Sequence, residues 1–126
     1  MKLRIRGSSV RFRLQQSEVR ALLAHGYVEE HTQLGTRPED RFTYRVELAD
    51  EANAPVASWR AGRLTVSIPT VAGRAWAERE ALGLEATQPV GDGEFLRILI
   101  EKDLACAVPR SGEDDGDAYP NPADRC

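Results

Sequence analysis

The chain has 126 residues, of which 41% are hydrophobic and 29% are charged, and its formal net charge is −3. This composition is that of a globular domain able to bury about two-thirds of its unfolded surface, and not of a disordered, fibrous or membrane-spanning chain. The N-terminus lacks the apolar core of a signal peptide, and two cysteines, Cys106 and Cys126, are too few for a disulfide framework. We therefore expect a cytoplasmic protein with free thiols.

The charge is unevenly distributed along the chain. Residues 1–20 hold six basic residues and one acidic residue, a net charge of +5, whereas residues 111–126 hold one basic and five acidic residues, a net charge of −4. Such asymmetry is typical of a nucleic-acid-binding face combined with an acidic tail. It is equally typical of two chain ends that pair with each other.

The first half of the chain predicts four strands and one helix. Alternating apolar and basic residues predict strands over 2–6 and 10–14, joined by a turn. A short helix follows, with Ser17 as a candidate N-cap and Gly26 as its stop signal. Two more strands are predicted, from Tyr27 to Leu34 and from Phe42 to Leu48, and residues 50–55 connect to the second half.

The second half predicts the same series. Strands are expected over 56–61 and 63–68, a helix from Pro69 or Thr70 to about Glu80, and strands over 83–88 and 95–101 around the turn Gly91-Asp92-Gly93. The last strand is apolar on both faces, which indicates a central, covered position. The helix is expected to bury Val71 and Trp76, and Trp59 is also expected in the core.

The two halves repeat one pattern at a constant offset of 54 residues, which matches Val10 with Leu64, Phe12 with Val66 and Leu22 with Trp76. We therefore predict an α+β fold of two β-β-α-β-β copies, 2–49 and 56–102, related by pseudo-twofold symmetry. Its strands are mostly antiparallel and curl toward a barrel, with two short helices. Residues 1–104 form a single domain, and residues 105–126 form an acidic, loop-like tail in which Tyr119 could dock as an apolar anchor.

Residues 62–85 resemble a known family. Gly62-Arg63-Leu64-Thr65-Val66-Ser67-Ile68-Pro69, then Arg74, then Ala81-Leu82-Gly83-Leu84-Glu85, are similar to the swapped-hairpin domain of AbrB-type transition regulators and antitoxins. Those domains are dimeric and read DNA with basic residues. The resemblance therefore implies a DNA-binding regulator.

A second resemblance covers nearly the whole chain. Met1-Lys-Leu-Arg-Ile-Arg-Gly, Leu14-Gln-Gln-Ser-Glu-Val and Glu101-Lys-Asp-Leu-Ala-Cys, with Glu113-Asp-Asp and Pro120-Asn-Pro, are similar to a family of short uncharacterised bacterial proteins. That family implies no particular activity.

The best candidate binding site is the first hairpin. Strand parity places five cations on one side of it, and we call this set the basic face: Lys2, Arg4, Arg6, Arg11 and Arg13. These like charges repel one another unless an anionic group lies across them. Nucleic acid would satisfy them, and so would Glu29, Glu47 or the acidic tail from within the chain.

Catalytic and metal-binding patterns are weak. The histidines His25 and His31 and the thiol of Cys106 do not stand at metal-ligand spacing, so no metal or cofactor is expected. His25 suits the end of a helix, and Cys106 is interpreted as an inert thiol rather than a nucleophile.

We therefore expect a small, non-enzymatic bacterial binding or interaction protein whose partner is an unknown protein or a second copy. It would have no membrane association, and nucleic acid is a possible partner. The alternative is an AbrB-like DNA-binding transcriptional regulator or antitoxin that uses the basic face. An enzyme using Cys106 or the acidic cluster is a third class.

Overall fold

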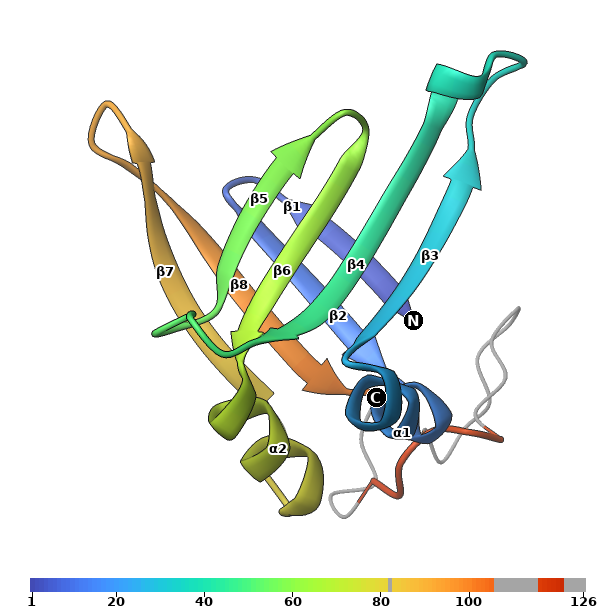
Figure 1. Ribbon diagram of the computed structural model, residues 1–126, viewed down its shortest axis with the longest axis vertical. Coiled ribbons are helices and arrows are strands. Elements are labelled where there is room, and N and C mark those ends of the chain that lie inside the picture. The colour runs from blue at the N-terminus through green and yellow to red at the C-terminus, as the bar shows by residue number, and fades with distance from the viewer. Residues whose placement is uncertain (82, 106–115, 122–126) are drawn as a thin grey trace.

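The computed structural model describes residues 1–81, 83–105 and 116–121. Over these residues the chain is an α+β protein in which two four-stranded sheets pack face to face and two helices lie together at one end (Figure 1). The strands are β1 (Lys2–Arg6), β2 (Ser9–Leu14), β3 (Tyr27–Gln33), β4 (Arg41–Ala49), β5 (Val56–Arg60), β6 (Arg63–Pro69), β7 (Gly83–Gly91) and β8 (Glu94–Lys102). The helices are α1 (Gln16–His25) and α2 (Thr70–Glu78), with a short 3-10 helix at Pro38–Asp40.

Each sheet takes one hairpin from each half of the chain. The strand orders are β1-β2-β8-β7 and β3-β4-β6-β5. Each hairpin is antiparallel, and the two hairpins of a sheet are joined by a parallel central pair, β2 with β8 and β4 with β6. The predicted α+β class with two short helices is therefore confirmed, and β8 is central as expected.

The core lies between the sheets and is closed by the helices at one end. Both members of each predicted pair are buried: Val10 with Leu64, Phe12 with Val66, and Leu22 with Trp76. Apart from the 3-10 helix at Pro38–Asp40, the order of strands and helices is the same in both halves. Superposition of the halves about a twofold axis stays a prediction.

The predicted curling toward a barrel does not reach closure, since the described strands form two separate four-stranded sheets. At the sheet edges, β1, β3, β5 and β7 each pair strand to strand with a neighbour of their own sheet and with no described strand of the other sheet. Between β5 and β7 a side chain bridges the gap: the amide of Gln88 accepts from the N–H of Ala57 at 2.7 Å and donates to its carbonyl at 2.9 Å. The Gln88 amide thus makes the two hydrogen bonds to Ala57 that a neighbouring strand would otherwise make.

Helix α1 begins one residue after Gln15 rather than at the expected Ser17 cap. The backbone N–H of Gln15 donates to the Glu18 carboxylate at 2.8 Å, as in a capping box. Ser17 instead donates its hydroxyl to Asp117 of the tail. The predicted stop is confirmed, since Gly26 adopts φ +85° and its N–H donates to the Leu22 carbonyl.

Helix α2 packs through Gly73 and Trp76, which are both buried. A Cβ at Gly73 would lie 2.5 Å from a methyl group of Leu48, so glycine allows the helix to approach β4 closely. The expected burial of Val71 is wrong: it is 83% exposed. No helix among the described residues has the length and apolar character needed to cross a membrane.

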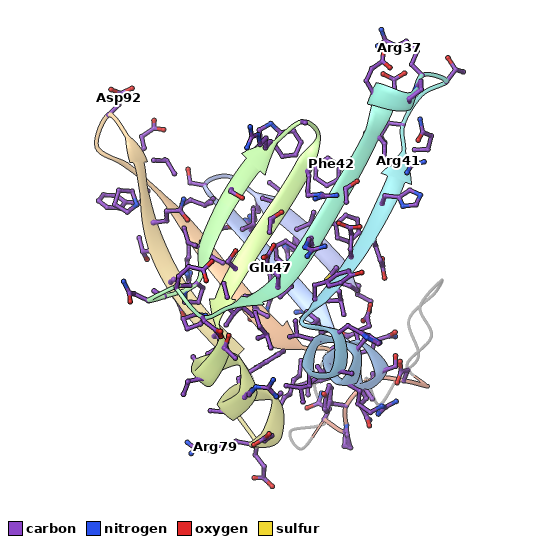
Figure 2. All side chains as sticks on the ribbon, viewed as in Figure 1. Arg37, Arg41, Phe42, Glu47, Arg79 and Asp92 are labelled. Carbon is purple, nitrogen blue, oxygen red and sulfur yellow. The ribbon has the colours of Figure 1, made fainter. Side chains whose placement is uncertain are left out.

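Trp59 is not in the core, because its side chain is 62% exposed. Its strand parity is the inward one of the buried Ala57, but Trp59 lies one residue before the end of β5, next to the turn that leads to β6. Figure 2 shows Arg41 and Phe42 at this same hairpin end, opposite the helical end that carries Arg79. The ring of Trp59 stacks at 5.6 Å on that of Phe42.

Lys102 is buried because it continues the inward parity of Ile98 and Ile100 past the end of the apolar run. Its ammonium donates to the Arg79 carbonyl at the end of α2 and lies 5.6 Å from the ring of Trp76. Burial lowers the pKa of this lysine. The contact fixes the C-terminus of α2, where a cation is favourable.

The two tryptophans should respond differently to truncation. Trp76→Ala removes a fully enclosed side chain and should lower the free energy of unfolding by about 3–5 kcal/mol. Trp59→Ala should lower it by less than about 1 kcal/mol, because most of the ring already faces solvent. Urea unfolding followed by circular dichroism measures both, and equal losses would contradict this placement.

The Gln88 bridge should also contribute to stability. Gln88→Ala leaves the buried N–H and C=O groups of Ala57 without partners and should cost about 1–3 kcal/mol. Gln33→Ala is the matched control, since Gln33 makes its hydrogen bonds within the exposed β3–β4 hairpin. A Gln88 variant as stable as the control in the same urea titration would show that the Gln88 bridge does not stabilise the fold.

Candidate functional site

The five predicted basic residues lie on the outer surface of the β1-β2-β8-β7 sheet. The register pairs Lys2 with Arg13 and Arg4 with Arg11, so four of them stand directly opposite each other on adjacent strands. Arg6 faces Ser9 next to the turn. The inward residues of the same strands enter the core, which fixes the outward direction of the cations.

The parallel pairing with β8 extends this surface beyond the basic face. Ser9 stands beside Arg97, Arg11 beside Leu99, and Arg13 beside Glu101. In the next strand, Glu85 stands opposite Leu99. The sequence analysis did not identify Arg97 or Glu101 as part of this surface, because no local signal indicates which strand lies beside β2.

Three cations of the basic face are paired with acids from the end of β8. Glu101 accepts from Arg11 at 3.0 Å and lies 3.7 Å from Arg13, and Asp103 lies 3.0 Å from the Lys2 ammonium. Asp103 is only 1% exposed, so this last pair is partly removed from water. Lys2, Arg11 and Arg13 are therefore neutralised by acids at or just after the end of β8.

The acids expected to neutralise the basic face lie elsewhere. Glu29 pairs with Arg45 and Arg63, and Glu47 pairs with Arg45, all on the outer surface of the other sheet. The expectation for Glu29 and Glu47 is therefore wrong. The cause is sheet assignment, because β3 and β4 belong to the sheet that does not contain β1 and β2.

The acidic tail is described only in part. Asp117 accepts from Gln16 and Ser17 at the start of α1, and the Tyr119 N–H donates to the Asp103 carbonyl at 2.6 Å. Ala118 is buried, so this part of the tail docks as anticipated for the tyrosine anchor. Glu113, Asp114, Asp115 and Cys106 lie outside the described residues.

A hollow of about 310 Å³ opens on the basic side of the sheet. Arg11 and Arg97, on its walls, are each held by a carboxylate, Glu101 and Glu85. Arg4 and Arg6 are exposed and form no ion pair with any acid in the described part of the chain. We call this the arginine hollow, and it is lined by Arg4, Arg6, Ser9, Arg11, Arg97 and Leu99. It can receive an anion of moderate size without first displacing an ion pair at Arg4 or Arg6.

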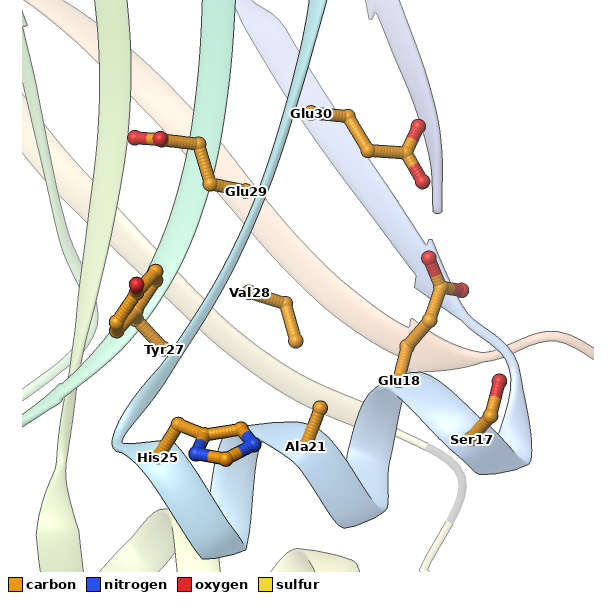
Figure 3. A pocket seen from close by; sticks show the side chains of 8 residues that line it. All are labelled: Ser17, Glu18, Ala21, His25, Tyr27, Val28, Glu29 and Glu30. Atoms are coloured by element: carbon orange, nitrogen blue, oxygen red, sulfur yellow. The ribbon is translucent and has the colours of Figure 1, made fainter.

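A second hollow, of about 380 Å³, lies between α1 and β3 and is lined by acidic residues and His25 (Figure 3). Its carboxylates already have partners. The Met1 amine donates to Glu18 and, at 2.8 Å, to Glu30, and the Tyr44 hydroxyl also donates to Glu30 at 2.8 Å. Figure 3 shows Glu18 and Glu30 on the same side of the hollow, away from His25.

These contacts shift three pKa values. Burial alone would raise the pKa of Glu30, but the hydrogen bonds from the Met1 amine and Tyr44 outweigh it, and the pKa falls below 4.5. Burial likewise opposes the Met1 amine, yet the two carboxylates raise its pKa above 8.0. Burial and then Glu30 raise the pKa of Tyr44 to about 12. The hollow therefore serves as a structural ion-pair cluster rather than as a poised acid–base pair.

His25 and His31 do not meet at one site. His25 is exposed in the last turn of α1, where a cation is favourable, and His31 is exposed on β3. Among residues 1–81, 83–105 and 116–121, no group of three metal-ligating side chains is found.

One comparison with known proteins identifies a family. A family model described as a family of unknown function, DUF7009, matches residues 1–123. No curated protein and no solved structure matches the chain.

The Glu30 cluster should make stability depend on pH. A lowered carboxyl pKa stabilises the fold above about 4.5 and loses this effect as the pH falls, whereas a raised amine pKa stabilises below about 8 and loses it as the pH rises. Glu30→Gln should therefore be most destabilising between these values. Urea titrations across the pH range measure the difference from wild type, with exposed Glu51→Gln as control. A difference that stays constant across the range would contradict the ion-pair assignment.

Proposed function

The chain belongs to DUF7009, a family of unknown function, and from this premise we propose that it is a small, non-enzymatic bacterial cytoplasmic protein that holds an anionic partner on the basic face. The single observation that carries the proposal is the state of Arg4 and Arg6. Both are exposed beside the arginine hollow, and no acid among the described residues pairs with them. The partner supplies carboxylates or phosphates to Arg4 and Arg6, as the chain's own carboxylates do for Arg11, Arg13 and Arg97.

The distribution of charge supports binding at this surface. Six cations, the basic face together with Arg97, stand on the outer side of the sheet against three carboxylates, those of Glu85, Glu101 and Asp103. Ion pairs at an exposed surface are each weak, so recognition depends on several cations acting together. The strand register holds them at fixed positions on a rigid sheet, which lowers the entropy cost of binding.

The non-enzymatic assignment rests on how the other charged groups are used. The carboxylates of the α1–β3 hollow hold the Met1 amine and Arg45, and the buried Lys102 holds the end of α2. These groups act in the stability of the fold, which leaves binding as the role of the basic face.

Duplex DNA is the second candidate partner, because a two-stranded ribbon with paired cations can enter a major groove. The position of β1 favours a protein partner instead. Of the two strands of this hairpin, only β1 is at a sheet edge, because β2 is held between β1 and β8. A ribbon that reads a groove has both of its edges free, whereas this hairpin has only one.

Fluorescence anisotropy with labelled poly-L-glutamate and with a labelled DNA duplex tests the proposal across a salt series. We expect poly-L-glutamate to bind, with affinity that falls as salt rises. The double variant Arg4→Ala, Arg6→Ala should weaken binding by about tenfold, since each exposed contact contributes up to about 1 kcal/mol. The matched control is Arg60→Ala, Arg74→Ala, which removes the same charge from exposed positions on β5 and α2.

Three results decide the outcome. Weaker binding by the Arg4, Arg6 variant but not by the control supports an anionic partner on the basic face. Tighter binding of the duplex than of poly-L-glutamate, with a salt slope lowered by about 2 in the same variant, would assign the protein to the DNA-binding alternative. Equal losses in both double variants would show that net charge alone is responsible and would overturn the proposal.

A further inference from the structure

The two places where the sheets meet edge to edge differ in a way that exposes β1. At one, the edges of β5 and β7 are joined by the Gln88 amide, which fills the hydrogen-bonding positions of Ala57. At the other, β1 and β3 diverge toward their hairpin loops (Figure 1), and a groove of about 480 Å³ opens between them. We call it the edge groove; it is lined by Met1, Lys2, Leu3, Thr32, Leu34, Phe42 and Tyr44.

The side chain that could bridge the edge groove is committed elsewhere. In the repeat pattern Gln33 corresponds to Gln88, with the offset slipped to 55, and Leu3 corresponds to Ala57 at the offset of 54. The Gln33 amide donates to the carbonyls of Gly35 and Arg37 within its own hairpin, at 2.9 and 2.7 Å. Among the described residues, no side-chain amide therefore bridges the Leu3 peptide as Gln88 bridges that of Ala57.

The backbone of β1 presents hydrogen-bonding groups to this groove. Arg6 and Ser9 close a two-residue hairpin, as Arg60 and Arg63 do in the second half. In such a hairpin the closing pair is hydrogen-bonded, and alternate residues turn their N–H and C=O groups away from the partner strand. These alternate residues are Leu3 and Ile5, and the bond between Ala57 and Gln88 follows the same geometry in β5.

The side chains beside this edge are apolar and uncovered. Ile5 is 58% exposed and Leu34 is 72% exposed. Leu34 and Phe42 also line a neighbouring hollow of about 450 Å³ together with Trp59, and the charged residues Glu39, Asp40 and Arg41 complete that hollow. Exposed apolar side chains beside the edge of a strand are typical of a site that accepts an added strand.

Charge decides which strand fits. On the outer side of β1, Lys2, Arg4 and Arg6 alternate with Leu3 and Ile5. A second copy pairing through its own β1 would set these cations against one another, which is unfavourable. A strand with acidic residues at the same alternate positions would instead pair with them, while its apolar residues enter the edge groove.

We propose that the edge of β1 is the docking site for an extended segment of a partner protein in which acidic and apolar residues alternate. The segment adds to the sheet as a fifth strand beside β1, hydrogen-bonded to the peptide groups of Leu3 and Ile5. Its acidic side chains meet Arg4 and Arg6 on the basic face, and its apolar side chains contact Leu34 and Phe42. This inference rests on the proposed function, because the basic face receives the acidic positions of the segment.

The test uses three labelled peptides of about six residues, which is the usual length of a strand. One alternates Val and Glu, the second has the same composition with three Val followed by three Glu, and the third is oligoglutamate. We expect the alternating peptide to bind about tenfold more tightly than the other two, because it alone can place carboxylates on one side and apolar groups on the other.

Two variants separate strand addition from charge attraction. Ile5→Pro removes the outward N–H of Ile5 and leaves the N–H groups that bond to β2, since proline is tolerated on an edge strand. Leu34→Asn alters the groove at an exposed position where folding should be unaffected. Both variants should lower the affinity for the alternating peptide to that for the peptide with three Val followed by three Glu. Val71→Asn, at an exposed apolar position on α2, should leave the affinity for the alternating peptide unchanged.

Hydrogen exchange adds a readout that charge attraction would not affect. The amide protons of Leu3 and Ile5 should be protected by the alternating peptide and not by oligoglutamate. Binding of oligoglutamate as tight as that of the alternating peptide, with no such protection, would overturn strand addition while leaving the proposed function in place. A concentration-dependent dimer that Ile5→Pro dissociates would assign the edge to a second copy and would also overturn the inference. Failure of all three peptides and of poly-L-glutamate to bind would remove the proposed function itself.

Discussion

The parallel pairing of β2 with β8 is the constraint on which most of this structure depends. It joins the N-terminal hairpin to the C-terminal hairpin, and so brings together residues about 90 positions apart. Inward residues of the two strands, such as Phe12 and Ile100, enter the core side by side. Outward residues of the same register bring Arg11 and Arg97 to one hollow. Core and candidate site are thus the two faces of a single pairing.

The same arrangement determines which strands are left at the edges. Because each sheet has a parallel pair at its centre, the outer strand of every hairpin lies at an edge. An edge strand exposes backbone donors and acceptors and must be covered, charged or paired to avoid aggregation. The chain covers the β5 edge with Gln88 and charges the β1 edge with Arg4 and Arg6. The cations on the β1 edge oppose pairing with a second copy and at the same time create a surface for an acidic strand.

Ion pairs within the described part of the chain neutralise some cations of the basic face and not others. Glu101 and Asp103 extend from the end of β8 to the residues nearest them, so the neutralised cations are Lys2, Arg11 and Arg13. Arg4 and Arg6 lie farther along β1, toward the turn, where β8 presents Arg97 and Leu99 instead of acids. The cations without an acidic partner among the described residues are therefore those nearest the β1–β2 turn.

Periodicity in the sequence determined the elements, their order and most inward and outward directions, because strand parity and helix stop signals such as Gly26 are local properties. It also placed five cations on one side of the first hairpin and identified Val10, Phe12, Leu64 and Val66 as core. Only the tertiary structure decided the pairing of β2 with β8, the addition of Arg97 and Glu101 to the basic face, and the pairing of Glu29 with arginines of its own sheet instead of with the basic face. Strand pairing between distant segments depends on the packing of whole faces and leaves no mark in either segment. The exposure of Trp59 follows from the same limit, since parity gives the direction of a side chain but not how far the second sheet extends over it.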